Sequence, residues 1–161
     1  MSYYDAIAPG YNQLYKEEQE RKLRLIVQHA NITPEQKLLD VGCGTAFSFD
    51  LFPCQCTGVE PSAGLISESK HKERIVQASA ENLPFADDFF DVVVCVTAMH
   101  NFSDLERALK EMARVGKDQW IFSLLKKSYL CDRMAASIRK CFQVYREIDE
   151  GRDLLLFCKK S

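Results

Sequence analysis

The stretch LLDVGCGTAFS, Leu38–Ser48, decides the fold that this sequence predicts. Its apolar start belongs to the predicted strand Lys37–Val41, which has the length of a short buried strand. The two glycines that follow let the backbone turn tightly and approach a ligand closely. Phe47–Phe52 then fits a short helix, which Pro53 ends. A strand that passes through a glycine-rich turn into a helix is typical of nucleotide-binding α/β proteins.

The rest of the chain alternates between strand-like and helix-like segments. Apolar residues at helical spacing predict helices, and short apolar runs predict strands. The predicted helices are Tyr15–Ala30, Ser62–Lys72 with Ser62 as its N-cap, Leu105–Val115 and Tyr129–Cys141. The further predicted strands are Thr57–Glu60, Arg74–Ala78, Phe90–Thr97, Gln119–Leu125, Phe142–Ile148 and Asp153–Lys159. The charged run Lys16–Arg24 in the first helix is expected to face solvent.

The order of these segments predicts a fold class. Strands that alternate with helices build a parallel sheet whose two faces are both covered, and the continuous apolar run Phe90–Thr97 has the pattern of such a strand. The last two strands flank a short polar turn and read as a hairpin. We therefore expect an α/β protein with a doubly wound, Rossmann-like, seven-stranded and mostly parallel sheet that ends in a C-terminal antiparallel hairpin.

Length and composition indicate a single domain. The chain has 161 residues, of which 47% are hydrophobic and 27% charged, so it can bury a core of ordinary size. We expect one domain over residues 1–161, with an N-terminal helical cover over residues 1–30 and a core over residues 36–161. The formal net charge of −2 argues against dominant non-specific binding to nucleic acid.

Two further patterns predict a cytoplasmic protein. The longest strongly apolar stretch, Val92–Val96, is far shorter than a membrane span. The first residues also lack the basic region followed by an apolar stretch that a signal peptide has. Seven cysteines, an odd count, argue against a disulfide framework. Cys54 and Cys56 are the only close pair, and no second pair completes a zinc site. We expect no membrane contact and no bound metal.

Two carboxylates mark the expected ligand site. Ligands of doubly wound sheets bind beyond the carboxyl ends of the strands. Asp40 ends the first predicted strand, and Glu60 lies 20 residues later, at the end of the second. An acidic residue at that place can accept hydrogen bonds from both ribose hydroxyls of an adenosine-type ligand. Gly42, Gly44 and Glu60 together therefore predict a site for such a ligand.

The chain resembles class I S-adenosylmethionine-dependent methyltransferases, especially the small-molecule type related to ubiquinone-biosynthesis enzymes. LLDVGCGTA, Leu38–Ala46, resembles the family's first motif, and GVEPS, Gly58–Ser62, resembles its acidic second motif. Ala78–Phe102 resembles the adenine-binding and fourth-strand region, and Ala108–Val115 resembles the helix before the fifth strand. Tyr4–Tyr15 resembles the N-terminal segment that folds over the cofactor. The likeness covers almost the whole chain in the family's order.

The resemblance implies S-adenosylmethionine as cofactor and S-adenosylhomocysteine as product, and it gives each matching residue a role. Asp40 would face the methionine amino group, and Glu60 would hold the ribose. The glycine loop would lie under the methionine part, with Cys43 contributing its backbone and not its thiol. The other implied cofactor contacts are Gly42, Gly44, Pro61, Ser79, Ala80, Thr97, Tyr4 and Tyr11, the two tyrosines closing the pocket.

His100 is the candidate catalytic residue. The resemblance places it near the sulfonium and the substrate, and its reference pKa near 6.5 suits a base for an acceptor that must lose a proton. A contact with substrate without proton transfer is the alternative. The sulfonium is already activated, so the reaction depends mainly on proximity and orientation.

Two residues depart from the family pattern. Ala46 stands where the family usually has a third glycine, and Ser79 stands where it often has aspartate. A methyl group at position 46 is either harmless or crowds the cofactor. Serine can accept a hydrogen bond from the adenine amine, but without charge assistance that bond is weaker.

The acceptor is not fixed by these motifs. Only the 16 residues of Lys126–Cys141 lie between the last parallel strand and the hairpin, which leaves no room for a substrate-covering insertion. We expect methyl transfer to a small molecule. Two alternatives stay open: an RNA or protein methyltransferase that works with a partner subunit, and a cofactor-binding regulatory protein with weak catalysis. A homodimer also stays open.

Overall fold

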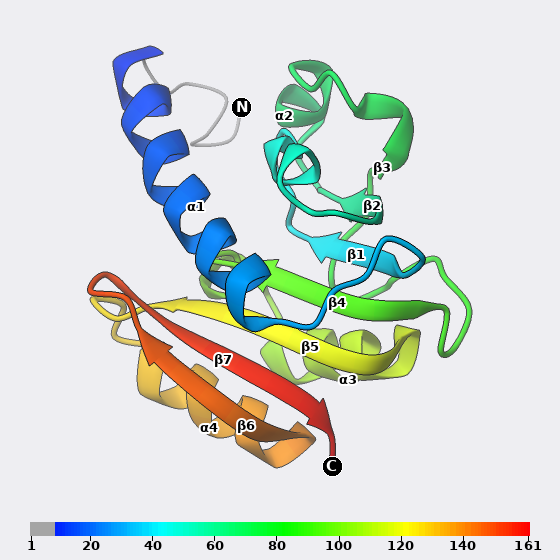
Figure 1. Ribbon diagram of the computed structural model, residues 1–161, viewed down its shortest axis with the longest axis vertical. Helices are drawn as coiled ribbons and strands as arrows, with labels where there is room; N and C mark the ends of the chain where they lie inside the picture. The colour runs from blue at the N-terminus through cyan, green and yellow to red at the C-terminus, as the bar shows by residue number, and fades with distance from the viewer. Residues whose placement is uncertain (1–8) are drawn as a thin grey trace.

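The computed structural model describes the backbone of residues 9–161 and the side chains of residues 13–161 (Figure 1). Seven strands form one sheet in the order β3-β2-β1-β4-β5-β7-β6. Neighbours from β3 to β5 are parallel, and β7 is antiparallel to both β5 and β6. The strands are β1 (Lys37–Val41), β2 (Gln55–Val59), β3 (Ile75–Val76), β4 (Phe90–Val96), β5 (Gly116–Leu125), β6 (Phe142–Asp149) and β7 (Asp153–Lys160).

This architecture confirms the predicted fold class: α/β, with a mostly parallel seven-stranded sheet and a C-terminal antiparallel hairpin. Within residues 9–161, one α-helix precedes the sheet, and three α-helices and three short 3-10 helices lie between the strands. The α-helices are α1 (Pro9–His29), α2 (Ala63–Ser67), α3 (Leu105–Val115) and α4 (Cys131–Cys141). The 3-10 helices are η2 (Phe47–Asp50), η3 (Lys72–Arg74) and η4 (Met99–Asn101).

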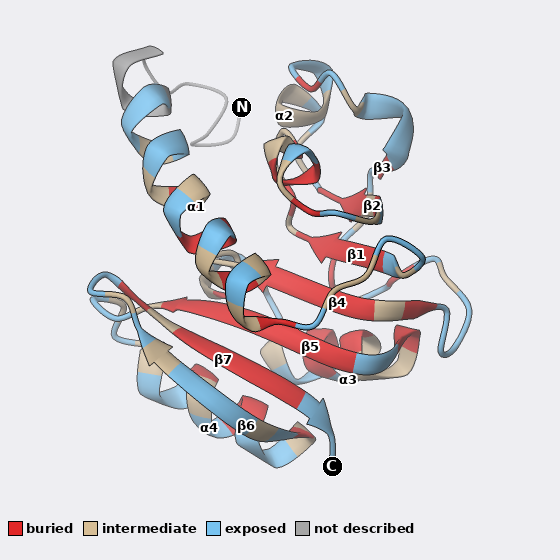
Figure 2. Cartoon of the chain, in the orientation of Figure 1, coloured by how far each residue is buried: buried red, intermediate tan, exposed pale blue. Residues whose placement is uncertain are grey.

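Two apolar layers cover the two faces of the sheet. Figure 1 shows α3 and α4 on one face and α1 on the other. Alternate residues of the central strand β4 serve the two layers: Val93 and Cys95 pack with α3 and α4, while Val92 and Val94 pack with α1. Because successive side chains of a strand point to opposite faces, a continuous apolar run is what a strand covered on both faces requires. Figure 2 shows the central strands as the buried part of the molecule.

Two elements are shorter than the sequence predicts. The predicted helix Ser62–Lys72 begins as expected, because the Ser62 side chain accepts a hydrogen bond from the Leu65 backbone N–H, but α2 ends at Ser67. The buried Ser69 hydroxyl donates to the Thr45 carbonyl at 2.5 Å, which ties this segment to the glycine-rich turn and away from a helical path. The predicted strand Arg74–Ala78 is reduced to β3, which pairs only with the last two residues of β2.

Candidate functional site

The turn after β1 is built from two glycines with left-handed backbone. Gly42 has φ +75° and Gly44 has φ +60°. A Cβ on Gly42 would lie 2.6 Å from the Cβ of Ala98, so the turn packs tightly against the segment that follows β4. A Cβ on Gly44 would meet no heavy atom of the described residues within 4 Å, because Gly44 borders a cavity.

The Glu60 carboxylate joins this turn to α2. Its Oε1 accepts a hydrogen bond from the Gly44 backbone N–H, and its Oε2 accepts one from the Ser62 backbone N–H, each at 2.9 Å. The residue is 7% exposed and lines the same cavity. A carboxylate oxygen can accept more than one hydrogen bond, so a carboxylate at this place is chemically suited to a ligand with hydroxyl groups. These two hydrogen bonds hold the carboxylate of Glu60 in a fixed orientation at the end of β2.

Asp40 is a second carboxylate in the same cavity. It is 3% exposed, and burial is the main reason that its pKa is raised to about 6. The Ser48 hydroxyl donates to Asp40 Oδ2 at 2.6 Å and opposes that rise, while the negative charge of Glu60 adds to it. Ser48 was not among the residues predicted from the sequence. Its place in the first turn of the helix after the glycines is the signal that could have shown it.

The cavity has a volume of about 480 Å³, within the usual range for ligand sites. It lies at the carboxyl ends of β1, β2 and β4, and most of the residues predicted for the cofactor line it. Pro61 and Ser79 are exposed at its rim, and Ala80 is buried. The predicted residues in its lining are Asp40, Gly42, Cys43, Gly44, Glu60, Pro61, Ser79, Ala80 and Thr97.

One wall of this cavity comes from α1. Tyr15, Lys16, Gln19 and Leu23 all line it. Tyr15 ends the segment Tyr4–Tyr15 that was predicted to fold over the cofactor, whereas the other three were not predicted. Gln19 is 5% exposed and Leu23 is 2% exposed, so the charged run Lys16–Arg24 is not a uniformly solvent-facing stretch, as the sequence had suggested. The four-residue spacing of Gln19 and Leu23 puts them on one face of the helix, which could have indicated the buried side.

The structure does not describe the side chains of the two N-terminal tyrosines that were predicted to close the pocket. Tyr4 lies outside the described residues. Tyr11 belongs to α1, but its side chain lies outside the described side chains. Both tyrosines therefore stay predictions.

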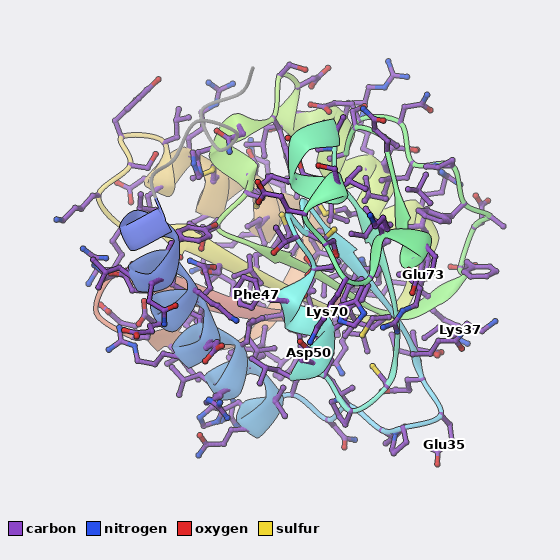
Figure 3. The ribbon with its side chains drawn as sticks, turned by 90° about the horizontal axis from the view of Figure 1, so that it is seen from above. Glu35, Lys37, Phe47, Asp50, Lys70 and Glu73 are labelled. Carbon is purple, nitrogen blue, oxygen red and sulfur yellow. The ribbon has the colours of Figure 1, made fainter. Side chains whose placement is uncertain are left out.

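The 3-10 helix η2 follows the glycine-rich turn and also contributes to the cavity. Phe47 lines the cavity, and Asp50 at the end of η2 is ion-paired with Lys70 at 2.9 Å, the two side chains lying side by side in Figure 3. His71 Nε2 lies 3.0 Å from the second oxygen of Asp50. These contacts connect η2 to the segment after α2, so the walls of the cavity support one another.

The methyl group of Ala46 lies in the apolar core. Ala46 has a left-handed φ of +60° and no exposed surface, and it packs in the layer that contains Phe49 and Cys43. Among the described residues it is not part of the cavity lining. The left-handed backbone explains why glycine suits this position, at a strain of roughly 1 kcal/mol for alanine. The concern that this methyl crowds a ligand is therefore not supported.

Cys43 contributes its backbone turn and a buried thiol. Burial is the main reason that the pKa of this thiol is raised, so it stays protonated. A Cβ on Gly58 of β2 would lie 2.5 Å from the Cys43 sulfur, which explains the glycine at position 58. All seven cysteines of the chain are free thiols. Within the described residues there is no group of three or more His, Cys, Asp and Glu side chains that could hold a metal ion.

His100 lies in a second cavity next to the first. This cavity has a volume of about 540 Å³ and shares Tyr15, Gln19 and Thr97 with the first one. His100 is half-buried on η4, and burial lowers its pKa below 6.5, partly opposed by the negative charge of Asp153. A histidine with a lowered pKa is neutral at pH 7 and can accept a proton.

Thr97 lies where the two cavities meet. Its φ of +53° is an outlier for a β-branched residue, and such strain is typical of functional positions. Its Oγ1 donates to Asp153 Oδ2 at 2.7 Å and lies 3.1 Å from Ser123 Oγ and from Lys22 Nζ. Lys22, Ser123 and Asp153 were not predicted from the sequence, because they are far apart along the chain and match no local motif.

Comparison with known proteins gives three findings. A family model described as a methyltransferase domain matches residues 39–123. The chain is 34% identical over 128 residues to YcgJ of Bacillus subtilis, described as an uncharacterized methyltransferase, covering 70% of this chain and 51% of YcgJ. It is 30% identical over 112 residues to a demethylmenaquinone methyltransferase of Corynebacterium urealyticum, covering 67% of this chain and 46% of that enzyme. The chain thus spans about half the length of the curated relatives it matches.

A solved structure shares the whole fold. The Haloferax volcanii protein that was solved in complex with the Trm112 methyltransferase activator superposes with a TM-score of 0.82 at 14% identity, covering 99% of this chain and 98% of that one. Within residues 9–161, none of the helices combines the length and apolar character that a membrane crossing requires.

Proposed function

We propose that this chain, which belongs to the methyltransferase domain family, transfers the methyl group of S-adenosylmethionine to a small-molecule acceptor. The observation that carries the proposal is the Glu60 carboxylate, held by the Gly44 and Ser62 backbone N–H groups at the edge of a cavity of about 480 Å³. That geometry suits a ligand with two adjacent hydroxyl groups. S-adenosylmethionine is the cofactor of the family and carries such a ribose.

The residues of the cavity fit this cofactor. Glu60 would hold the ribose, Asp40 would face the amino group, and Ser79 and Ala80 would meet the adenine. The open space beside Gly44 leaves the backbone accessible to a ligand. When bound, the cofactor supplies an activated methyl group on sulfur. The residues of the chain would then orient the cofactor and the acceptor and accept any proton that the acceptor loses.

The second cavity supports the choice of a small acceptor. It adjoins the first at Thr97, so a molecule in it lies next to a cofactor in the first. Its volume of about 540 Å³ matches the size of ordinary small-molecule sites. His100 lines this cavity as a neutral imidazole and would take a proton from the acceptor. The likeness to a demethylmenaquinone methyltransferase, whose name indicates a small acceptor, favours the same class.

Calorimetry with S-adenosylhomocysteine tests the cofactor site. The wild-type chain should bind it, and Glu60→Ala should weaken binding about 100-fold, because two hydrogen bonds to a charged acceptor contribute roughly 1.5 kcal/mol each. Glu73→Ala, on the exposed helix η3, is the matched control and should bind as wild type. A folded wild-type chain that binds neither S-adenosylmethionine nor S-adenosylhomocysteine would overturn the proposal.

A second candidate is methyl transfer to RNA or protein together with a partner subunit. The observation that favours it is the Haloferax neighbour, which matches this chain over nearly its full length and was solved with an activator protein. Co-purification of the chain from its native cells, followed by tests of bound proteins and RNA as acceptors, distinguishes the two candidates. An acceptor that reacts only in the presence of a co-purified subunit would favour the second.

A further inference from the structure

The floor of the second cavity holds a buried ion pair. Lys22 of α1 is 3% exposed and Asp153 of β7 is fully buried, and Lys22 Nζ lies 3.1 Å from Asp153 Oδ2. Thr97 and Ser123 both donate hydrogen bonds to that same oxygen, at 2.7 and 2.5 Å. Lys22, Thr97, Ser123 and Asp153 form what we call the Lys22 cluster. Lys22, Thr97 and Asp153 line the second cavity directly.

Stability alone does not explain this cluster. A buried ion pair loses so much hydration that well-packed apolar residues are often equally or more stabilising. The cluster is also incompletely satisfied, because Asp153 Oδ1 is buried and has no hydrogen-bond partner among the described residues. Lys22 donates to Thr97 Oγ1 and faces Asp153 Oδ2, so its three N–H groups are not all engaged within the described residues. A charged pair with remaining donor capacity beside a cavity is suited to a ligand.

The charges around the second cavity favour an anion. Its acidic residues are both engaged, Glu18 with Arg152 and Asp153 with Lys22. Lys126, at its rim, is paired with Asp149 outside the lining, and Lys127 is exposed. The charged and titratable lining residues are Glu18, Lys22, His100, Lys126, Lys127, Arg152 and Asp153. Cations outnumber acids in this set even with His100 neutral.

His100 adds a base to the charged residues that line the second cavity. Neither of its ring nitrogens has a hydrogen bond to a described residue, so an unprotonated nitrogen is available to a ligand. A neutral base and a cation on the same cavity can convert an acidic O–H or S–H group into an anion and hold it. They offer less to an amine, which reacts through a neutral lone pair and gains little from a neighbouring ammonium group.

We propose that the acceptor is a small acid that is methylated as its anion, with His100 removing the proton from its O–H or S–H group and Lys22 holding the resulting charge. The inference rests on the proposed function. The proton moves from the acceptor to a ring nitrogen of His100, and the electron pair left on oxygen or sulfur forms the bond to the methyl carbon. The carbon–sulfonium bond breaks, its pair stays on that sulfur, and S-adenosylhomocysteine is the product. His100 returns its proton to water.

Three chromogenic probes test this proposal in the complex with S-adenosylhomocysteine. 4-Nitrophenol and 4-nitrothiophenol change colour on ionisation, and 4-nitroaniline has a similar shape but does not form an anion. We expect the pKa of bound 4-nitrophenol or 4-nitrothiophenol to fall by about 1 unit or more, the effect of an opposite charge within a few ångströms. The stronger shift identifies oxygen or sulfur as the preferred nucleophile. With S-adenosylmethionine, the same probe should be methylated and 4-nitroaniline should not.

The double variant Lys22→Gln/Asp153→Asn removes both charges and keeps similar shapes. It should retain S-adenosylhomocysteine binding but lose the shift in the pKa of the probe, an outcome that a purely structural ion pair would not produce. Lys140→Gln, an exposed lysine at the end of α4, is the matched control and should keep the shift. If the double variant does not fold, the pKa of the probe bound to the wild-type protein still tests the proposal.

Two failures are distinguishable. Absence of S-adenosylhomocysteine binding to the wild-type chain overturns the proposed function itself. Normal binding of S-adenosylhomocysteine, with the pKa of neither 4-nitrophenol nor 4-nitrothiophenol lowered by the protein, overturns the inference about the acceptor and leaves the methyltransferase proposal standing. Methylation of 4-nitroaniline in preference to both acids does the same.

Discussion

The two adjoining cavities are built by different means. The carboxylates and glycines of the first come from β1, β2 and the turns after them, with α1 and the end of β4 completing its lining. Backbone N–H groups hold its key carboxylate, Glu60. The second is formed by α1, the end of β4 and the start of β7, and side-chain charges hold it together. Its central pair joins Lys22 to Asp153, at opposite ends of the chain. A site fixed by backbone geometry tolerates change in many side chains, whereas a site fixed by a charge pair depends on both partners.

Removal of one partner of the buried ion pair should have the largest effect on the second cavity. Asp153→Ala leaves the Lys22 ammonium buried without its carboxylate, so we expect the free energy of unfolding to fall by about 3–5 kcal/mol. Urea denaturation measures it. Glu147→Ala is the control, because it breaks an exposed ion pair with Arg139, and it should change stability by less than about 1 kcal/mol. Equal effects of the two substitutions would mean that the pair is not the support we infer.

In the first cavity, the dependence of protein stability on pH tests the buried state of Asp40. Its pKa is raised from 3.8 to about 6 in the folded protein, so the folded state binds a proton more readily than the unfolded state. Stability should therefore fall as the pH rises from about 4 to about 6, by up to about 3 kcal/mol. Asp40→Asn should remove this decline, be more stable than wild type at pH 7, and bind S-adenosylhomocysteine more weakly. Parallel stability–pH curves for variant and wild type would contradict the assignment.

Substitution of the two turn glycines tests the backbone of the first cavity. Gly42→Ala combines a left-handed backbone with a Cβ placed 2.6 Å from Ala98, and we expect a loss of about 2–4 kcal/mol. Gly44→Ala has the same kind of backbone but open space, so its loss in stability should be about 1 kcal/mol. Its larger effect should be on S-adenosylhomocysteine affinity. Thermal unfolding and calorimetry of both variants separate packing from ligand contact, and a reversed order of stability would refute the packing argument.

The smallest expected effect is the titration of His100. Burial lowers its pKa below 6.5, so its imidazole signal in a proton NMR titration should have a midpoint below that value. As the pH falls through that midpoint the base becomes protonated, and a methyl transfer that requires it should slow. His100→Gln identifies the signal and should flatten the acid limb of the rate profile. A midpoint above 6.5 would show that the charge of Asp153 outweighs burial.

The sequence predicted the first cavity far better than the second. Leu38–Ser48 and Gly58–Ser62 are contiguous motifs whose local backbone already fixes where Gly44 and Glu60 lie. By contrast, Lys22 belongs to a charged run that has the composition of a solvated helix face, and its burial is visible only once α1 is packed beside β7. The helix Ser62–Lys72 was overestimated for a similar reason, since the bond from Ser69 to Thr45 is a tertiary contact.

The fold class, the order of strands and helices along the chain, and the carboxylates and glycines that line the first cavity could be predicted from the sequence, and the resemblance of its motifs indicated the methyltransferase family. These follow from periodicity and from short motifs, which act through neighbouring residues. The folded structure was needed to show that the methyl group of Ala46 lies in the core, that His100 lines a second cavity, and that Lys22 and Asp153 form a buried ion pair there. The physical reason is that desolvation and charge pairing depend on what surrounds a side chain in space, and residues distant along the chain supply those surroundings.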